Sequence, residues 1–325
     1  MTETSLSQPF VGPAAGRAPL RLLAVCIGFA ALVAAPMFFY PIFVMKILCF
    51  ALFASAFNLL LGYTGLLSFG HAAFFGGAAY VTAHAVKVWG FPPELAVLAG
   101  VLGAIVIGAV IGFLAIRRQG IYFAMITLAL SQMFYFFCLQ APFTGGEDGI
   151  QGVQRGKLLG FIDLGQTMNM YYFVLGIFLL GIFAIWRIVN SPFGAILKSI
   201  RENETRAISL GLSVNAYKLS AFVMSAAIAG LAGSTKALIF QFATLTDVTW
   251  QMSGEVILMT LMGGIGTLLG PVVGAGLVVT LQNVLATSEF PVTVITGATF
   301  MLCVLTFRRG IVGEIEAAIV RWKRR

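Results

Sequence analysis

Long apolar runs follow one another through most of this chain, and they restrict what it can fold into. Runs such as 95–116 and 171–189 are close to the ~20 residues that an α-helix needs to cross a bilayer. Hydrophobic residues make up 59% of the chain and charged residues 10%, whereas about a quarter of the residues in soluble domains are charged. The sequence therefore predicts an all-α polytopic membrane protein.

The spacing of these runs predicts about ten crossings and three regions. Residues 1–21 are polar and rich in Pro, Gly and Ser, so we expect a disordered tail. A transmembrane domain covers 22–307, and 308–325 form a basic tail. The first run, 22–40, could belong to a cleaved signal peptide, but its length favours a retained span. The interval 253–287 is too long for one crossing, and its glycines predict two short spans joined by a turn.

Basic residues are distributed unevenly between the two sides of this predicted topology. With the N-terminus inside, fifteen lie in inner segments: Arg17, Arg21, Arg117, Arg118, Arg187, Lys198, Arg201, Arg206, Lys218, Arg308, Arg309, Arg321, Lys323, Arg324 and Arg325. Three lie in outer segments: Lys87, Arg155 and Lys157. Cytoplasmic loops carry such an excess of Lys and Arg. We therefore expect both termini in the cytoplasm and residues 141–170 outside. The net charge of +8 has the same explanation, so no nucleic-acid partner is expected.

The segment 191–218 is the longest strongly charged interval of the chain. Apolar residues recur in it at three- and four-residue spacing, which corresponds to one face of a helix. Ser191 and Pro192 suit the start of that helix, and Gly211 suits its end. We therefore predict a short amphipathic helix between two spans. It could be a solvated connector on the lipid surface. Alternatively, it could be a docking surface, because small Ala and Gly residues allow a partner to approach closely.

Two segments combine apolar surroundings with polar side chains. The segment 58–74 is interrupted by glycines, and irregular backbone at membrane depth is tolerated only where protein buries it or it lines a cavity. The polar residues of this segment and of the fifth span are Asn58, Ser68, His71, Thr127, Ser131 and Gln132. They could line a water-accessible path between this chain and a second subunit, or they could hydrogen-bond neighbouring helices.

The sequence contains no convincing catalytic or metal-binding pattern. It lacks the phosphate-binding loop of ATPases, an HExxH motif and a Cys-x-x-Cys pair, so we expect neither an enzyme nor a cofactor. All four cysteines sit in apolar runs, which favours packing. Two hypotheses of solute transport across the membrane remain. The chain could be a permease driven by separate ATPase subunits, or a secondary transporter that works alone. A secondary carrier usually needs ionisable residues inside the membrane, and the candidates are His71, Lys46, Lys236 and Glu255.

Several motifs of the chain resemble those of one family. They are Ser191-Pro-Phe-Gly194 with the charged residues after it, the run GYTGLLSFGHAAFFGGAAY that begins at Gly62, and the segments that begin at Gly120 and Thr144. These motifs resemble the permease subunits of branched-chain amino acid ABC transporters, in particular the LivM-type half. The resemblance extends over nearly the whole chain after the N-terminal tail.

The resemblance implies an ABC importer permease bundle in the bacterial inner membrane, paired with a LivH-type sister permease. Two cytoplasmic ATP-binding subunits and a periplasmic substrate-binding protein would complete the importer. Its cargo would be leucine, isoleucine or valine, with urea or short amides as the alternatives among relatives. The resemblance also assigns the segment 191–218 to coupling with the ATPase, through Phe193, Gly194, Ile200, Arg201, Glu202, Asn203, Glu204, Ala207 and Gly211.

Overall fold

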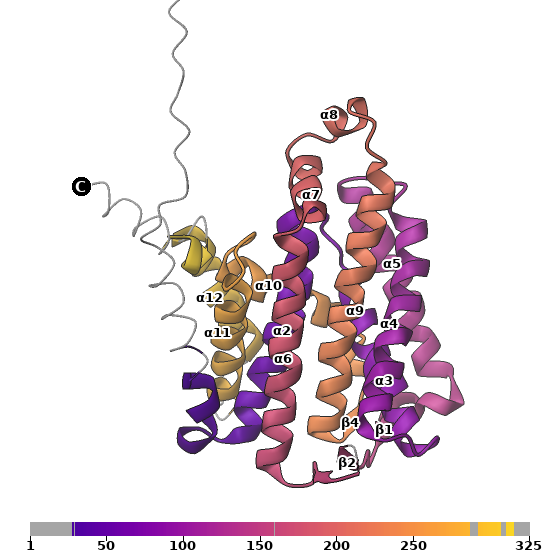
Figure 1. Ribbon diagram of the computed structural model, residues 1–325, viewed down its shortest axis with the longest axis vertical. Coiled ribbons are helices and arrows are strands. Elements are labelled where there is room, and N and C mark those ends of the chain that lie inside the picture. Colours follow the sequence, from indigo (N-terminus) through magenta and orange to yellow (C-terminus); the bar gives the residue numbers. More distant parts are fainter. Residues whose placement is uncertain (1–27, 29, 159, 287–291, 307–309, 315–325) are drawn as a thin grey trace, which may run out of the picture.

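A computed structural model describes residues 28, 30–158, 160–286, 292–306 and 310–314. The predicted N-terminal tail and most of the basic C-terminal tail lie outside these residues, as does the start of the first predicted span. The described part is a bundle of helices with four two-residue strands at one end (Figure 1).

Five helices are long and apolar enough to cross a membrane: α2 (Pro41–Thr64), α4 (Pro93–Ala115), α5 (Ile121–Gln140), α6 (Thr167–Val189) and α9 (Val214–Phe240). The other large helices are shorter: α3 (His71–Lys87), α10 (Trp250–Gly263), α11 (Gly270–Leu285) and α12 (Val292–Thr306). This architecture confirms the prediction of an all-α polytopic membrane protein. The number of ten crossings stays a prediction.

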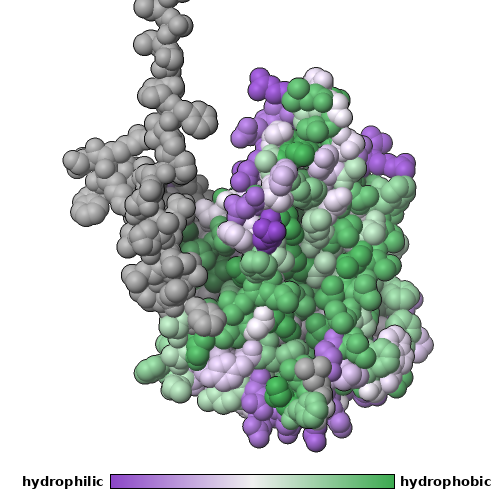
Figure 2. Space-filling view, in the orientation of Figure 1, coloured by the Kyte–Doolittle hydropathy of each residue, from purple (hydrophilic) through white to green (hydrophobic). Residues whose placement is uncertain are grey.

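Helices α2 and α9 form the centre of the bundle. Both are buried over most of their length, and they pack against each other. Helices α3 and α4 pack on α9, while α6 and α11 pack on α2. The outer helices α4, α5 and α6 are only about a third buried, and they expose large apolar side chains such as Leu98 and Leu102. Figure 2 shows an apolar band between two polar ends, which is the surface that a lipid bilayer can cover.

The chain breaks between α2 and α3, as the glycines predicted. Gly65 follows the last residue of α2 in the left-handed backbone conformation (φ +76°), which a glycine adopts without strain. Residues 65–70 are non-helical, and α3 starts at His71, which is fully buried in the bundle. The amide of Ala72 donates a hydrogen bond to Ser253 Oγ (3.0 Å), so α10 satisfies one of the free amides at the start of α3.

A second break separates α10 from α11, where the sequence predicted two short helices. Residues 264–269 form the turn between them. Gly263 and Gly274 face the other helix so closely that a Cβ on either would lie 1.8 Å from a backbone oxygen. Only glycine lets the two backbones pack at this distance.

One end of the bundle carries the polar segment 141–166, and we call it the outer end after its predicted side. The segment contains the turns η2 (Pro142–Thr144) and η3 (Gly146–Asp148) and the strands β1 (Ile150–Gln151), β2 (Lys157–Leu158) and β3 (Ile162–Asp163). Strand β1 pairs with β4 (Phe242–Ala243), which follows α9, and β2 pairs with β3. The turn η4 (Leu245–Asp247) comes next. The charged segment 191–218 lies at the opposite end (Figure 1).

The charged segment forms two helices where the sequence predicted one. Helix α7 (Pro192–Glu202) begins after Ser191, whose Oγ accepts a hydrogen bond from Gly194 N (3.4 Å), as predicted. Asn203 is extended, and its side chain accepts a hydrogen bond from Arg206 N (2.9 Å). The prediction of a single helix was wrong because Asn203 caps a new helix, α8 (Glu204–Ser209). Gly211 follows α8 with φ +80°, as predicted, and residues 214–218 belong to α9.

Candidate functional site

The inner face of α7 and α8 is packed onto the bundle. Ile200 of α7, Ala207 of α8 and Val214 of α9 form a small buried cluster. Gly194 and Leu197 are buried as well. The small residues of the predicted docking face therefore contact this chain itself. Gly194 and Ala207 are buried in these contacts, whereas Gly211 stays exposed.

Two basic side chains attach α7 to the end of α2. The Arg201 guanidinium donates a hydrogen bond to the carbonyl of Gly62, and its aliphatic part lies next to Gly65. Lys198 Nζ lies 5.6 Å from the ring centroid of Tyr63, within cation–π range. Gly62 is in the last turn of α2, where carbonyls lack partners within the helix and the helix dipole favours cations. Arg201 therefore acts as a side-chain cap for a helix that is distant in sequence.

Helix α8 is attached to its neighbours by a carboxylate. Glu204 Oε2 forms a 2.7 Å ion pair with Lys218 of α9, and Glu204 Oε1 accepts a hydrogen bond from Gln119 (2.8 Å). Lys218 is buried, so salt screens this pair less than a surface pair. At the start of α7, Phe193 packs on Tyr217, with ring centroids 5.7 Å apart. The whole segment is thus held in one position on the bundle.

The outward face of the segment exposes apolar side chains among charges. Ile208 and Leu210 are 57% and 73% exposed. Glu202, Arg206 and Gly211 are exposed beside them. Large apolar side chains at the tip of a projecting segment, surrounded by polar residues, are typical of a protein-binding surface. The outward face, which we name the α8 tip, is therefore the part that a partner can reach.

Asn58 holds the turn between α10 and α11. Its side-chain amide donates to the carbonyl of Thr267 (2.8 Å), and its Oδ1 accepts from Gly266 N (2.9 Å). A Cβ on Gly62, one turn along α2, would come within 2.4 Å of Asn58 Oδ1 and 2.8 Å of Gly266 N. Contacts through Arg201, Gly62 and Asn58 thus join the charged segment to the α10–α11 turn.

His71 is fully buried, and it is hydrogen-bonded through Nε2 while its Nδ1 has no partner among the described residues. Its Nε2 lies 2.9 Å from Ser225 Oγ, which donates its own proton to the carbonyl of Ala56 (2.5 Å). Ser225 must therefore accept the bond from a protonated Nε2. The imidazole also makes edge contacts with Phe57 and Phe74. His71 thus links α3 to α2 and α9.

Ser68 and Thr127 lie where the broken segment 65–70 meets α5. The hydroxyl of Thr127 accepts a hydrogen bond from Phe69 N (3.2 Å). Ser68, Thr127 and Ser131 are fully buried in this chain. Ser131 Oγ and Gln132 Nε2 are buried without a hydrogen-bond partner among the described residues. The structure therefore places the broken segment against Thr127 of α5, while Ser131 and Gln132 of α5 retain unused hydrogen-bonding capacity.

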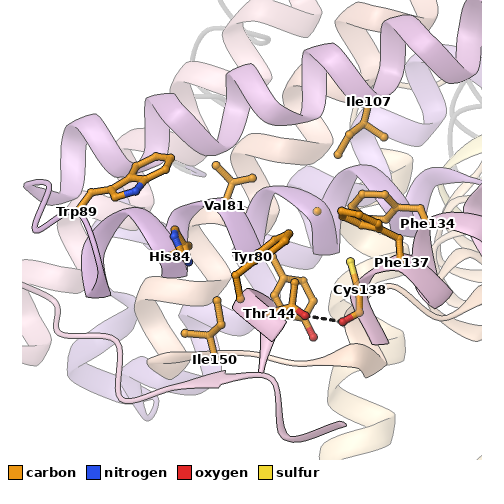
Figure 3. A pocket seen from close by; sticks show the side chains of 12 residues that line it. Tyr80, Val81, His84, Trp89, Ile107, Phe134, Phe137, Cys138, Thr144 and Ile150 are labelled. Atoms are coloured by element: carbon orange, nitrogen blue, oxygen red, sulfur yellow. Dashed lines mark hydrogen bonds between the residues drawn. The ribbon is translucent and has the colours of Figure 1, made fainter. Parts of the chain in front are cut away.

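A cavity of 310 Å³ lies between α3, α4 and α5 near the outer end (Figure 3). Its wall is mainly aromatic and aliphatic, with Tyr80, Trp89, Ile107, Phe134, Phe137 and Phe143 among the lining residues. Tyr80 Oη and His84 Nδ1 are buried without a partner among the described residues. Thr144, by contrast, donates to the carbonyl of Cys138 (2.5 Å), the dashed line in Figure 3.

The sequence alone does not identify several of the hydrogen-bond partners described above. Ser225 and Ser253 satisfy His71 and the start of α3, yet they lie in runs of small and apolar residues. Tyr80 and His84 could have been noted, because their spacing of four places them on one face of a helix. The residues that the structure describes include no group of His, Cys, Asp or Glu able to hold a metal ion.

Comparison with known proteins agrees with this architecture. The family profile described as "Branched-chain amino acid transport system / permease component" matches residues 40–305. The high-affinity branched-chain amino acid transport system permease proteins LivM of Salmonella typhimurium and Escherichia coli are each 28% identical over 68% of this chain and 58% of their own length. A probable branched-chain amino acid transport permease protein LivM of Methanocaldococcus jannaschii is 25% identical over 55% of the chain and 51% of its own length.

The matched region thus spans little more than half the length of these curated relatives. No solved structure matches the chain significantly. The family profile, however, begins at the start of α2 and ends within α12, so it covers every large helix described above. The chain therefore belongs to the permease component family of branched-chain amino acid transport systems.

Proposed function

We propose that this chain is the membrane-spanning permease subunit of an ATP-driven importer for branched-chain amino acids or similar small polar solutes. The observation that carries the proposal is the α7–α8 segment, which projects from one end of the bundle. It exposes Ile208 and Leu210 on its outward face and is attached to α2 through Arg201 on its inward face. A rigidly attached segment of this kind can pass the movement of a bound subunit to the membrane helices.

The proposed complex contains two ATP-binding subunits at the α8 tips, a LivH-type sister permease and a periplasmic substrate-binding protein. ATP is hydrolysed by the ATP-binding subunits, and this chain supplies neither an ATPase site nor a cofactor. The complex lies in the bacterial inner membrane, with both termini of this chain in the cytoplasm. The concentration of basic residues in the predicted inner segments supports this orientation.

The substrate path is proposed to run beside the buried polar residues of the broken segment and of α5. Ser131 and Gln132 support this path most, because each has a buried polar atom without a hydrogen-bond partner in this state. Such an atom costs about 1–3 kcal/mol. In another state of the transporter, water or solute would satisfy it. Both polar atoms of Asn58 have partners within the chain, which favours a structural role for it. His71 is bonded at Nε2, while its buried Nδ1 has no partner among the described residues. Ser68 and Thr127 lie beside the path in this proposal.

Two alternative functions remain: a permease for urea or short amides in the same family, and a secondary transporter that works alone. Uptake assays in a strain without its own transporters for these solutes separate them. We expect uptake of leucine, isoleucine and valine only when the ATP-binding subunits are co-expressed. Uptake by this chain alone would identify a secondary transporter, and uptake of urea or acetamide without leucine would identify an amide permease.

A further inference from the structure

The cavity between α3, α4 and α5 is a partly open space of 310 Å³ whose wall is rich in rings (Figure 3). Five aromatic residues line it: Tyr80, Trp89, Phe134, Phe137 and Phe143. His84 adds an imidazole, which makes edge contacts with the rings of Trp89 and Phe143 at centroid distances of 5.4 and 6.2 Å. An apolar cavity of about 150 Å³ can hold benzene, so this one has room for a substituted ring.

The cavity reaches the surface within the apolar band, near the outer end. Trp89, Phe137 and Phe143 line it, and each is more than half exposed. Helices α4 and α5, which bound the cavity, expose further apolar side chains such as Leu98 and Phe136. A lipid bilayer can cover this surface, so a molecule dissolved in the membrane has access to the cavity.

Two polar atoms of the wall are buried without a partner among the described residues, Tyr80 Oη and His84 Nδ1. The two residues are four positions apart on α3, so they lie on one face of the helix, roughly 6 Å apart along its axis. The hydroxyl of Thr144 also lines the cavity, but it already donates to the carbonyl of Cys138 (2.5 Å). The wall thus offers two free hydrogen-bonding atoms on one side of an apolar space.

Water and a plain hydrocarbon chain both fit this wall poorly. A buried water needs two to four polar partners, and large apolar cavities stay dry. A lipid acyl chain would fill the apolar space, but it would leave Tyr80 Oη and His84 Nδ1 unpaired, which is costly. A flat ring with oxygen atoms on opposite edges meets both demands. Its faces pack against aromatic side chains, and its oxygens accept two separate hydrogen bonds.

We propose that this cavity binds a membrane-soluble quinone. The hydroxyl of Tyr80 donates to one carbonyl oxygen of the ring. His84 donates to the other through Nδ1, in the tautomer that carries the proton there. The ring itself packs among Trp89, Phe134 and Phe137. This site is separate from the proposed solute path and does not depend on the transported cargo.

The test measures binding of duroquinone, a benzoquinone with a methyl group at every free ring position, to the purified full-length chain in detergent. Quinones quench tryptophan fluorescence, so Trp89 is the reporter once Trp186, Trp250 and Trp322 are replaced by Phe. We expect quenching that saturates. Durene, the same methylated ring without oxygens, should compete at least tenfold less strongly than duroquinone itself, because it leaves both polar atoms unpaired.

Two conservative variants each remove one hydrogen bond and keep a ring. Tyr80→Phe should weaken duroquinone binding about three- to tenfold, while durene binding stays within twofold of the wild type. His84→Phe should have the same effect through the other hydrogen bond. Tyr172→Phe is the matched control, because it removes a phenol hydroxyl from an exposed ring of α6 and should change neither affinity.

A further variant fills the cavity. A Cβ at Gly77 would lie 2.8 Å from the Ile107 side chain and 3.1 Å from the Phe134 ring, both in the wall. Gly77→Val should therefore lower the affinity for duroquinone and durene alike, at least tenfold. In the ligand-free protein Tyr80→Phe should not reduce stability, because its hydroxyl then has no partner. It keeps the proposal testable even if Gly77→Val does not fold.

The site is refuted if quenching rises without saturation, or if Tyr80→Phe and His84→Phe both bind duroquinone within twofold of the wild type. Durene that competes as well as duroquinone would show an apolar cavity without selectivity for a quinone. Full displacement of duroquinone by an equal amount of phospholipid would assign the cavity to an acyl chain and overturn the proposal. All these measurements are made without transport, so a failure of the proposed function would leave them unchanged.

Discussion

The guanidinium of Arg201 donates a hydrogen bond to the backbone carbonyl of Gly62, which lies 139 positions earlier in the chain. This bond joins the first charged helix to the end of the most central membrane helix. Gly62 also touches the α10–α11 turn, which Asn58 holds by two further bonds. A displacement of α7 would therefore act on two membrane elements at once.

Arg201→Met should reduce transport more than it reduces stability. The substitution removes the cap of the Gly62 carbonyl, and because Arg201 is largely exposed we expect a stability loss of about 1 kcal/mol. Transport should fall at least fivefold while ATP hydrolysis continues, which paired uptake and ATPase assays would reveal. Arg118→Met removes an exposed charge from the same end and should change neither. Unaltered uptake by Arg201→Met would exclude a transmission role for this bond.

Gly62→Ala should displace the α10–α11 turn. The added methyl group would come within 2.4 Å of Asn58 Oδ1 and 2.8 Å of Gly266 N, so the two bonds made by Asn58 cannot persist. We expect a loss of about 2–4 kcal/mol from two broken, partly buried hydrogen bonds, measured by thermal unfolding in detergent. Gly176→Ala in α6 is the matched control, because a Cβ there meets nothing within 4 Å. It should be neutral or stabilising by up to about 1 kcal/mol through helix propensity.

The double variant Ile208→Glu/Leu210→Glu should weaken binding of the ATP-binding subunit. Both side chains are exposed, so the change should leave the fold intact and place two carboxylates on the proposed contact surface. Co-purification of the ATP-binding subunit should fall at least tenfold at unchanged yield of the permease. Val88→Glu, an exposed apolar residue near the outer end, serves as the control. Equal recovery of the subunit with the double variant would place the contact elsewhere.

Ser131→Cys should become reactive toward water-soluble thiol reagents in only one nucleotide state. Its hydroxyl is fully buried and unpaired in this structure, so labelling requires the path beside α5 to open. The experiment needs a background in which Cys26, Cys49, Cys138 and Cys303 are replaced. Labelling with and without ATP is then compared by mass spectrometry. If the thiol stays unreactive in every state, Ser131 is a packing residue.

Tyr80→Phe and Tyr171→Phe should have opposite effects on stability. Tyr80 is only 4% exposed and its hydroxyl lacks a partner among the described residues, so its removal should be neutral or stabilising. Tyr171 donates a 2.5 Å hydrogen bond to the carbonyl of Leu32, so its hydroxyl should be worth about 1 kcal/mol. Thermal unfolding of both variants measures the difference. A large loss for Tyr80→Phe would mean that water or a bound ligand occupies the cavity beside it.

Local features of the fold could be predicted from the sequence because they depend on neighbouring residues. Apolar runs of span length predicted the all-α membrane bundle, and glycine-rich intervals predicted the breaks before α3 and between α10 and α11. The start of α7 at Ser191 and the left-handed Gly211 were also predicted, since capping needs only residues close in the chain. The exception is Asn203, whose capping bond competes locally with helix continuation.

Only the tertiary structure decided which partners the polar residues use. The bonds of Asn58 to Gly266 and of His71 to Ser225 join residues 208 and 154 positions apart. Such pairs leave no periodic pattern in the sequence, because the packing of whole helices brings them together. The same holds for Ala207: an apolar helix face looks alike in sequence whether it packs on its own chain or on a partner. Its burial against Ile200 shows that this face packs on the bundle, and we propose the exposed side chains beside it as the docking surface.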